Sequence, residues 1–376
     1  MQFRDLKKQY EVLKLDIDAE IQSVLDSSSF ILGKQVIELE EKLAKYVGRK
    51  HCVTCASGTD ALVLSLMAND VGEGDAVFVP DFTYIASASC ASLVNATPVF
   101  VDINLSTFNM DANSLDEAIQ RTIEEGKLTP KVIIPVDLFG LPADFNSIRK
   151  VAEKYNLLVL EDAAQGFGGM LNGRKACSFG DISATSFFPA KPLGCYGDGG
   201  AVFTDDDSVD ERLRSIRAGG KSPYDKYDNR EIGTNSRLDT IQAAILLPKL
   251  KAFEDYELEN INKAASWYTD RLNGMVITPT VPDDFYSSWA QYTIRLESKT
   301  QRDMLQNKLK DAGIPCMIYY PRGMHQQQVF KNMIIDDSCY ENTCKAVDTV
   351  LSLPMHPYLD EDTVDMICNS IIDYLK

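Results

Sequence analysis

Histidine is scarce in this sequence of 376 residues, and the three that occur, His51, His325 and His356, lie far apart along the chain. This spacing argues against a histidine-rich metal site, so we expect no bound metal. No apolar run approaches the roughly 20 residues that span a bilayer, and the first residues lack the apolar core of a signal peptide. We therefore expect a cytoplasmic protein that does not enter a membrane.

Positive charge is also in short supply, because 38 lysines and arginines face 55 aspartates and glutamates, for a formal net charge of −17. An acidic surface repels phosphate backbones, so we expect no nucleic-acid partner. The nine cysteines, an odd number, favour reduced thiols over a disulfide framework. Cys52 and Cys55 have redox or zinc spacing, but in the strand expected there their thiols would point to opposite faces, which favours a core role.

Three common motifs of nucleotide-binding and hydrolytic enzymes are missing. Gly72-Glu73-Gly74 is not a dinucleotide fingerprint, because Val77 stands where the third glycine would be. The sequence contains neither the Gly-x-x-x-x-Gly-Lys-Ser/Thr loop that cradles phosphates nor the Gly-x-Ser-x-Gly turn of a serine nucleophile. The functional residues must therefore be sought in another pattern.

What the sequence does contain, from His51 onward, is a regular alternation of short apolar strands and helices. The expected strands are 53–56, 76–79, 98–101, 132–136 and 157–160, and the expected helices are 61–67, 85–94, 115–123 and 145–155. Such alternation predicts βαβ units, a mostly parallel sheet and ligands at the carboxyl ends of its strands. The predicted fold class is α/β.

The flanking regions have patterns of their own. Before the alternation, apolar residues at helical intervals predict two helices separated by Gly33, the first carrying Val12, Leu15, Ala19 and Val24. After it, we expect a helix over 237–272, a strand over 289–296, a helix over 302–312, a strand over 315–320 and a helix over 362–374. This predicts a helical arm over 1–48, a large domain over 49–245, and a connecting helix with a small α/β domain over 246–376.

Lys191 is the first candidate for chemistry. A short apolar run ends at Pro189, and Gly194, Gly197 and Gly199 follow the lysine closely, so backbone can crowd around a ligand there. A lysine between apolar residues and a glycine turn loses solvation, which lowers its pKa and makes a neutral amine available for a Schiff base with a carbonyl group. Judged on this segment alone, a surface lysine at a strand end remains the competing interpretation.

Two further segments complete a pattern. Residues 55–62 read as a strand end, a turn at Gly58 and a helix start, which is a credible phosphate seat, although Ser57 or Thr59 as a plain helix cap explains the segment equally well. The apolar strand 157–160 delivers Glu161 and Asp162, which alternation sends to opposite sides, and Asp162 could also cap the following turn. A phosphate seat, a carboxylate and a lysine on successive strand ends are the three groups that a pyridoxal phosphate site needs.

Five motifs in this order resemble the DegT/StrS group of nucleotide-sugar aminotransferases, which are fold type I pyridoxal phosphate enzymes. The motifs are Ser57 to Leu62, Glu161 to Gln165, Ser186 to Lys191, Gly197 to Ala201 and Asn235 to Ala244. Segments 30–33 and 187–201 resemble most closely the members that aminate UDP-2-acetamido-2-deoxy-3-oxo-glucuronate for surface polysaccharide. The resemblance implies a large domain with a mostly parallel sheet and a small C-terminal domain.

The resemblance also implies roles for single residues. Lys191 would bind the cofactor covalently and later move the proton, and Asp162 would hold the pyridine nitrogen. The remaining cofactor contacts would be Gln165 at the ring hydroxyl, Gly58, Thr59 and Ser186 at the phosphate, and Tyr84 stacked on the ring. For Tyr84, a core aromatic at a helix start is a serious alternative. Asn235 would reach the phosphate of the neighbouring subunit, which implies a homodimer with shared active sites.

The candidate substrate-binding residues are the cations around one long loop and the residues of segment 319–327. The long polar loop 218–234 contains Lys221 and Arg230, and Arg237 follows it. These cations are candidates to bind a diphosphate or a sugar carboxylate, since the planar guanidinium of arginine matches such anions. For Lys221 and Arg230, a solvated charged loop is an equally good explanation. Residues 319–327 stand where the family usually has Tyr-Pro-x-Pro-Leu-His-x-Gln beside the sugar. This implies substrate contacts from Tyr320, Arg322 and His325.

The activity implied is transfer of an amino group from L-glutamate, through pyridoxal phosphate, to the keto carbon of a nucleotide sugar. A UDP-linked 3-oxo sugar fits the resemblance best, with dTDP-linked 3-oxo or 4-oxo sugars as the alternative. A sugar dehydratase of the same fold has histidine at the lysine position, so Lys191 argues against it. A regulator of this fold would carry a DNA-binding domain, for which we find no segment.

Overall fold

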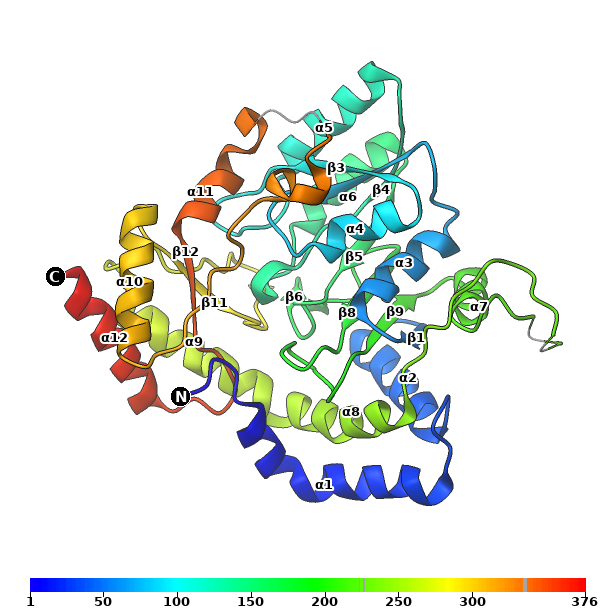
Figure 1. The fold of residues 1–376 in the computed structure, drawn as a ribbon, viewed down its shortest axis with the longest axis horizontal. Helices are drawn as coiled ribbons and strands as arrows, with labels where there is room; N and C mark the ends of the chain where they lie inside the picture. Colours follow the sequence, from blue (N-terminus) through cyan, green and yellow to red (C-terminus); the bar gives the residue numbers. More distant parts are fainter. Residues whose placement is uncertain (223, 226, 334–336) are drawn as a thin grey trace.

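A computed structural model describes residues 1–222, 224–225, 227–333 and 337–376 (Figure 1). Within these residues the largest sheet has seven strands in the order β1-β9-β8-β5-β4-β2-β3. Their bounds are β1 His51–Cys55, β2 Asp75–Pro80, β3 Thr97–Val101, β4 Thr129–Ile133, β5 Leu158–Asp162, β8 Ile182–Ser186 and β9 Gly200–Thr204. Neighbours from β3 to β8 pair in parallel, and β9 is antiparallel to both β8 and β1, so the sheet is mostly parallel as predicted.

Helices cover both faces of this sheet, which is why its strands are apolar on both sides. On β2, Ala76 and Phe78 point into one core cluster while Val77 and Val79 point into another. The first face carries α2 Lys34–Val47, α5 Ala112–Glu125, α6 Phe145–Tyr155 and α8 Thr240–Ala252; the second carries α3 Gly58–Ala68, α4 Ala86–Leu93 and α7 Asp207–Ile216. The predicted α/β fold class is confirmed, and Cys52 and Cys55 lie in the two different clusters.

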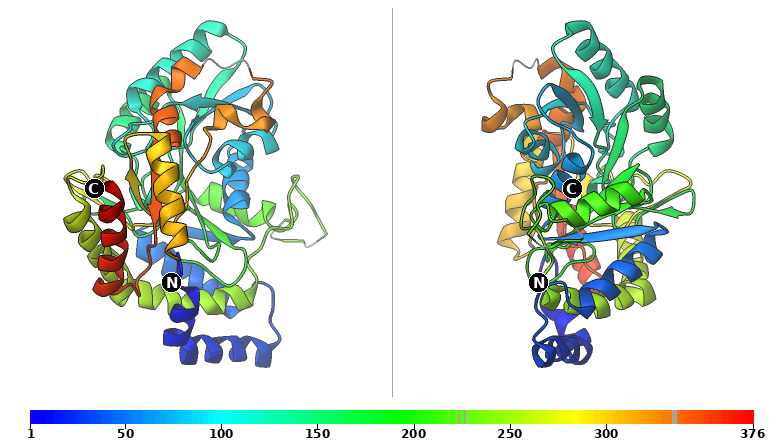
Figure 2. Two further views of the ribbon diagram at one scale, coloured as in Figure 1. Left: turned by 60° about the vertical axis from the view of Figure 1, so that its left-hand side comes forward. Right: turned by 90° about the vertical axis from the view of Figure 1, so that its right-hand side faces the viewer.

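The N-terminal helix α1, Leu6–Ser27, lies alongside α8, as Figure 1 and Figure 2 show at the bottom of the molecule. Its buried residues are Gln9, Leu13, Ile17 and Val24, of which Val24 was predicted, whereas Val12 and Leu15 are exposed. The prediction of two helices around Gly33 is confirmed, but the predicted buried positions were partly wrong. A helix that packs against one neighbour buries only a narrow stripe of side chains. Because exposed apolar residues lie beside this stripe, the sequence pattern did not show which face of the helix is buried.

The C-terminal part has its own core, formed by α9 Leu258–Leu272, β11 Tyr292–Arg295, α10 Lys299–Asp311, β12 Val350–Leu353 and α12 Glu361–Leu375. It lies to the left in Figure 1. The remaining elements are β6 Met170–Leu171, β7 Arg174–Lys175, β10 Phe285–Tyr286, α11 Glu341–Thr349 and the short helices η1 Leu138–Gly140, η3 Met324–Gln326, η4 Gln328–Phe330 and η5 Asp337–Tyr340. The division of the chain at residues 48 and 245 stays a prediction.

Two predictions for this region need correction. The long helix starts at Thr240 rather than Arg237, and a π-helical turn, η2 Phe253–Glu257, joins α8 to α9; Pro248 lies inside α8. The strand predicted over 315–320 was wrong, because Met317 alone of these residues makes a bridge, to Ser352. The next side chains, Ile318 to Tyr320, pack beside Phe82, which follows β2. Their apolar character reflects this contact rather than a strand.

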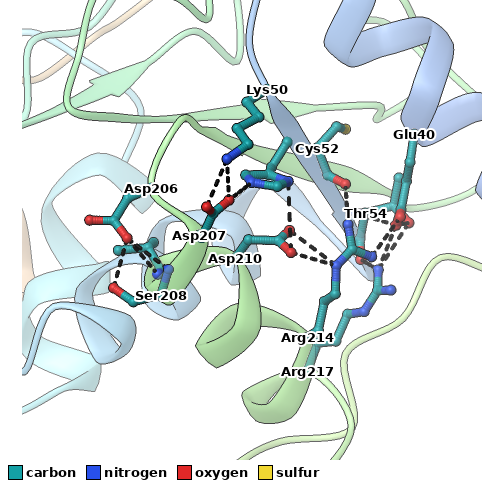
Figure 3. A network of polar contacts seen from close by, with 12 residues as sticks. Glu40, Lys50, Cys52, Thr54, Asp206, Asp207, Ser208, Asp210, Arg214 and Arg217 are labelled. Atoms are coloured by element: carbon teal, nitrogen blue, oxygen red, sulfur yellow. Dashed lines mark hydrogen bonds and ion pairs between the residues drawn. The ribbon is translucent and has the colours of Figure 1, made fainter. Parts of the chain in front are cut away.

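Helix α2 is fixed to the sheet by a buried ion pair that sequence reasoning did not find (Figure 3). The Glu40 carboxylate accepts hydrogen bonds from Arg217 at 2.6 Å and from Arg214 at 2.9 Å. It also accepts from the backbone N–H and the hydroxyl of Thr54 on β1. Glu40 and Arg217 are 8% and 6% exposed, so neither charge has access to much water.

We therefore expect Glu40→Gln to lower the free energy of unfolding by about 3 kcal/mol, because it leaves Arg217 buried without a counter-charge. Urea unfolding followed by circular dichroism measures the change. Lys50→Met is the matched control: it breaks the 2.7 Å pair with Asp207, which Figure 3 shows in the same network but which is largely exposed. Equal stability of the two variants would contradict a stabilising role for the buried pair.

Candidate active site

All strands of this sheet except β9 run in the same direction, so the carboxyl ends of β1, β2, β5 and β8 lie along one edge of it. The segments that follow them carry most of the predicted cofactor residues. Three contacts confirm that these segments meet: Ser87 donates to Asp162, the Ala163 N–H donates to the Ala184 carbonyl, and Gly58 abuts Ser186. This edge is therefore the candidate site.

The lysine turn, residues 187–199 between β8 and β9, is closed at its neck by hydrogen bonds from the Phe187 N–H to the Gly199 carbonyl and from the Cys195 N–H to the Phe187 carbonyl. At Gly194 a side chain has no room, because a Cβ would lie 2.5 Å from the Pro189 carbonyl oxygen. Lys191 sits inside this turn, where its N–H donates to the Phe188 carbonyl at 2.8 Å. The glycines thus allow the backbone to fold tightly around the lysine.

The electrostatic surroundings of Lys191 suit a neutral amine. Burial lowers the pKa of Lys191 below its ordinary value, the Asp162 carboxylate raises it, and the Arg4 guanidinium lowers it again. The net direction is downward, because the loss of solvation is the largest of these effects. A larger fraction of the amine is therefore unprotonated at neutral pH than in a solvated lysine.

Asp162 is 4% exposed at the end of β5. Its Oδ2 accepts from the Ser87 hydroxyl at 2.7 Å and its Oδ1 from the Ala164 N–H at 3.1 Å, so it also supports the turn, as the alternative interpretation had it. Burial raises the pKa of Asp162, and these two hydrogen bonds and Lys191 oppose that rise. Glu161 points the other way and accepts from Ser183 and from backbone N–H groups, which confirms the predicted alternation.

The predicted phosphate seat is the start of α3. Ser57 caps the helix by accepting from the Asp60 N–H at 3.0 Å, and the first N–H groups of a helix point out of its end. A Cβ on Gly58 would lie 2.6 Å from the Cβ of Ser186. Gly58, Thr59 and Ser186 therefore lie together, and their donors fit a phosphate group.

Three more predicted residues adjoin this edge. The Gln165 side chain accepts from the Phe139 N–H and donates to the Tyr320 hydroxyl, both at 3.0 Å. The Tyr84 ring centre lies 6.4 Å from that of Tyr320. Because Tyr84 is 53% exposed, the alternative of a core aromatic is wrong, and its ring remains free to cover a ligand. Sequence reasoning missed Ser87 and the Phe139 N–H, which no local pattern marks.

His325 is buried rather than open to the site. Its Nδ1 lies 2.5 Å from the Asp81 carboxylate, its N–H donates to the same group, and its ring stacks on Tyr340. A Cβ at Gly323 would lie 2.5 Å from the Asp81 carboxylate, which explains a glycine at that position. The pair fastens segment 319–327 to the end of β2, and a direct substrate contact from His325 stays a prediction.

The residues predicted to contact the partner lie beside this cluster, because the surface pocket that includes them is also lined by Gly197 and Asp198 of the lysine turn. Asn235 is exposed and accepts from the Arg237 guanidinium, and a surface pocket of about 450 Å³ includes both. Their neighbour Ser236 donates to Asp60 at the start of α3. Arg322 is exposed as well. Figure 1 shows the segment after α7 extending from the body of the protein; Pro223 and Lys226 of this loop lie outside the described residues.

Two features are absent from the described residues. In that part of the chain no helix is long and apolar enough to cross a membrane. The same part contains no group of three or more histidine, cysteine, aspartate or glutamate side chains arranged to hold a metal ion.

Comparison with known proteins places this geometry in context. The model of the DegT/DnrJ/EryC1/StrS aminotransferase family matches residues 12–372. A UDP-2-acetamido-2-deoxy-3-oxo-D-glucuronate aminotransferase of Pseudomonas aeruginosa is 44% identical, over 99% of each chain. A UDP-N-acetyl-3-dehydro-alpha-D-glucosamine 3-aminotransferase of Acidithiobacillus ferrooxidans is 40% identical, over 98% of this chain and 96% of that protein.

Solved structures agree with these relatives. A DegT DnrJ EryC1 StrS aminotransferase from Brucella abortus superposes with a TM-score of 0.96 at 46% identity, covering 100% of this chain and 99% of that one. The NtdA protein of Bacillus subtilis with bound cofactor PMP superposes with a TM-score of 0.87 at 27% identity, covering 96% and 81% of the two chains. The predicted fold type I architecture and the predicted family resemblance are confirmed.

Proposed function

Since the chain belongs to the DegT/DnrJ/EryC1/StrS aminotransferase family, we propose that it transfers an amino group to the keto carbon of a UDP-linked 3-oxo sugar. Aminotransferases of this family depend on pyridoxal phosphate, and this cofactor is the one that the chain uses. The observation that carries the sugar assignment is that the two relatives named above, at 44% and 40% identity, are both UDP-linked 3-oxo sugar aminotransferases. A 3-oxo-glucuronate is the first substrate to test.

The site residues fit the cofactor. When bound, pyridoxal phosphate supplies an electron sink for the carbon that loses a proton. The Asp162 carboxylate would face the pyridine nitrogen and keep it protonated, and the Lys191 amine would hold the cofactor covalently and carry the proton between reacting carbons. The seat at Gly58, Thr59 and Ser186 would bind the phosphate, Gln165 would orient the ring hydroxyl, and Tyr84 would cover the ring.

The proposed reaction has two halves that use these same groups. In the first, Lys191 would take the proton from the carbon that carries the amino group of L-glutamate, which leaves as 2-oxoglutarate. In the second, Lys191 would return a proton to the keto carbon of the nucleotide sugar as that carbon receives the amino group. Arg237 and Arg322 are the proposed anion contacts, because a sugar carboxylate or a diphosphate matches the guanidinium fork.

We also propose that the active enzyme is a homodimer. Asn235 is exposed and bonded to the half-buried Arg237, and neither has a hydrogen bond to the lysine turn of its own subunit within the described residues. In the proposed dimer Asn235 would reach the phosphate bound by the neighbouring subunit, as the family resemblance implies. Sedimentation of the purified protein checks the assembly, with a monomer as the contradicting result.

The proposed function is tested by incubating the holoenzyme with L-glutamate and a UDP-linked 3-oxo-glucuronate, and by measuring the product mass. The expected product carries an amino group in place of the keto oxygen, and 2-oxoglutarate forms in equal amount. UDP-linked 3-oxo-glucosamine and dTDP-linked 3-oxo and 4-oxo sugars serve as competing substrates. Faster conversion of a dTDP-linked sugar would contradict the UDP assignment, and loss of water would indicate a dehydratase.

The phosphate seat gives a prediction of its own. Gly58→Ala places a methyl group 2.6 Å from the Ser186 Cβ, so one side of the seat must shift, and the affinity for pyridoxal phosphate is expected to fall about tenfold. Titration of the cofactor-free enzyme measures it. In the control Gly72→Ala, the new methyl group would lie 3.7 Å from the Val94 carbonyl oxygen, an ordinary contact. Unchanged affinity in Gly58→Ala would remove the seat from this location.

A further inference from the structure

The residues before α1 reach the lysine turn from outside the sheet. Nη2 of Arg4 donates to the carbonyl oxygen of Lys191 at 2.7 Å and to that of Pro192 at 3.1 Å. In the sequence Arg4 lies 187 residues before Lys191 and 188 residues before Pro192. The first bond holds the backbone of the residue that carries the reactive amine. The lysine turn is thus fixed by two sets of hydrogen bonds, the backbone bonds that close it and the bonds from Arg4.

The same short segment is fastened to the C-terminal part of the chain. The Phe3 carbonyl accepts from the Met355 N–H at 3.1 Å, and the Phe3 ring meets the Tyr319 ring edge-on with centroids 6.1 Å apart. Figure 1 shows the N-terminus beside the connection that leads to α12. Residues 3–5, which we term the N-terminal arm, therefore connect the lysine turn to the segment that supplies Tyr320.

The charge of Arg4 persists in this environment. Burial lowers the pKa of Arg4 to about 10, the Glu257 carboxylate opposes that change, and the group is still protonated at neutral pH. Arg4 also interacts with two other buried ionisable groups, Lys249 and His356. Burial lowers the pKa of Lys249 to about 7 and that of His356 to about 4. Asp5 lies near His356, and Glu257 also accepts hydrogen bonds from Gln9 and Tyr358.

We propose that Arg4 is a positioning residue for Lys191: from the N-terminal arm it fixes the backbone of the lysine turn and holds a positive charge beside the reactive amine. This inference rests on the proposed function, in which Lys191 carries the cofactor. The two contributions act in the same sense, because a like charge disfavours protonation of the amine, and a fixed backbone keeps that amine directed at the carbon from which it takes a proton.

The choice of variants follows from the contacts. Both carbonyls bind one nitrogen, Nη2, and in the described part of the chain Nη1 is buried without a hydrogen-bond partner. A lysine can therefore replace part of the interaction, so Arg4→Lys is expected to resemble the wild type more closely than Arg4→Met. The matched control is Lys7→Met, which removes a positive charge from the same region but from an exposed side chain paired with Glu11.

The first measurement uses the cofactor-free enzyme. Reductive methylation over a range of pH, with peptide mapping, gives the labelling profile of Lys191. In Arg4→Met the profile should move to higher pH, so that labelling at pH 7.5, relative to its high-pH maximum, falls about threefold. Arg4→Lys should move less and Lys7→Met not at all. An Arg4→Met profile that coincides with that of Lys7→Met would overturn the proposal.

The second measurement uses the holoenzyme. The pH at which the absorbance of the lysine-bound cofactor changes should rise in Arg4→Met, and kcat should fall several-fold while the KM for L-glutamate is unchanged. Should Arg4→Met fail to fold, Arg4→Gln, which keeps an N–H donor without the charge, gives the same comparison. If wild type shows no lysine-bound cofactor, the proposed function fails; if wild type does and the Arg4 variants match it in both measurements, this inference alone fails.

Discussion

Replacing Lys191 by alanine is expected to lower the rate of amino transfer on the order of 10⁵-fold or more, because one side chain both holds the cofactor and moves the proton. The yellow colour of the lysine-bound cofactor should vanish. The fold should persist, since the hydrogen bonds that close the lysine turn come from backbone groups of Phe187, Cys195 and Lys191. Steady-state kinetics, absorbance and circular dichroism measure the three effects.

The matched control is the second buried lysine near this turn. Lys249 is 1% exposed, its amine lies 4.8 Å from the centre of the Tyr196 ring, and burial lowers its pKa to about 7. A lowered pKa therefore does not by itself identify the cofactor lysine. The position of Lys191 in the lysine turn beside Asp162 does. Lys249→Met should keep the coloured cofactor. A coloured, active Lys191→Ala together with a colourless Lys249→Met would reverse the assignment.

Asp162→Asn is expected to lower the rate by about 10²- to 10³-fold while some cofactor remains bound. The amide has nearly the shape of the carboxylate, but it carries no charge to keep the pyridine nitrogen protonated, so the electron sink weakens. Ser87 can still donate to the amide oxygen, which keeps the local structure in place. The rate and the cofactor content of the purified variant are the two quantities to compare.

Asp198→Asn serves as the control for this substitution. It removes an exposed carboxylate from the same lysine turn, so it changes the net charge equally without reaching the pyridine nitrogen. Its rate should stay close to that of the wild type. Should Asp162→Asn match Asp198→Asn, the proposed role of Asp162 would have to be abandoned.

The parts of the fold that periodicity predicted are those where one physical effect dominates. Strands buried on both faces are continuous apolar runs, and helices buried on one face repeat apolar residues at helical intervals. Helix α6 has the predicted bounds, Phe145–Tyr155. Where two effects mix, the prediction failed. On α1 exposed Val12 and Leu15 obscured the buried stripe, and residues 318–320 are apolar because they pack beside Phe82 rather than in a strand.

The candidate site divides in the same way. Lys191, Asp162 and Gly58 could be predicted as site residues because each lies at or shortly after a strand end with a local signature of glycine or alternation. Ser87, which donates to Asp162, and the Phe139 N–H, which orients Gln165, carry no such signature. Arg4 contacts a residue 187 positions away, and a contact of that range has no trace in a local pattern. Geometry was needed to find them.

The central claim is that Lys191 holds pyridoxal phosphate covalently. Reduction of the purified holoenzyme with borohydride fixes such a linkage, and mass spectrometry of the proteolytic peptides then locates it. The account predicts one reduced cofactor per chain, on the peptide that contains Lys191, and an unmodified Lys249. A reduced cofactor on any other lysine, or none in an enzyme saturated with the cofactor, would contradict it.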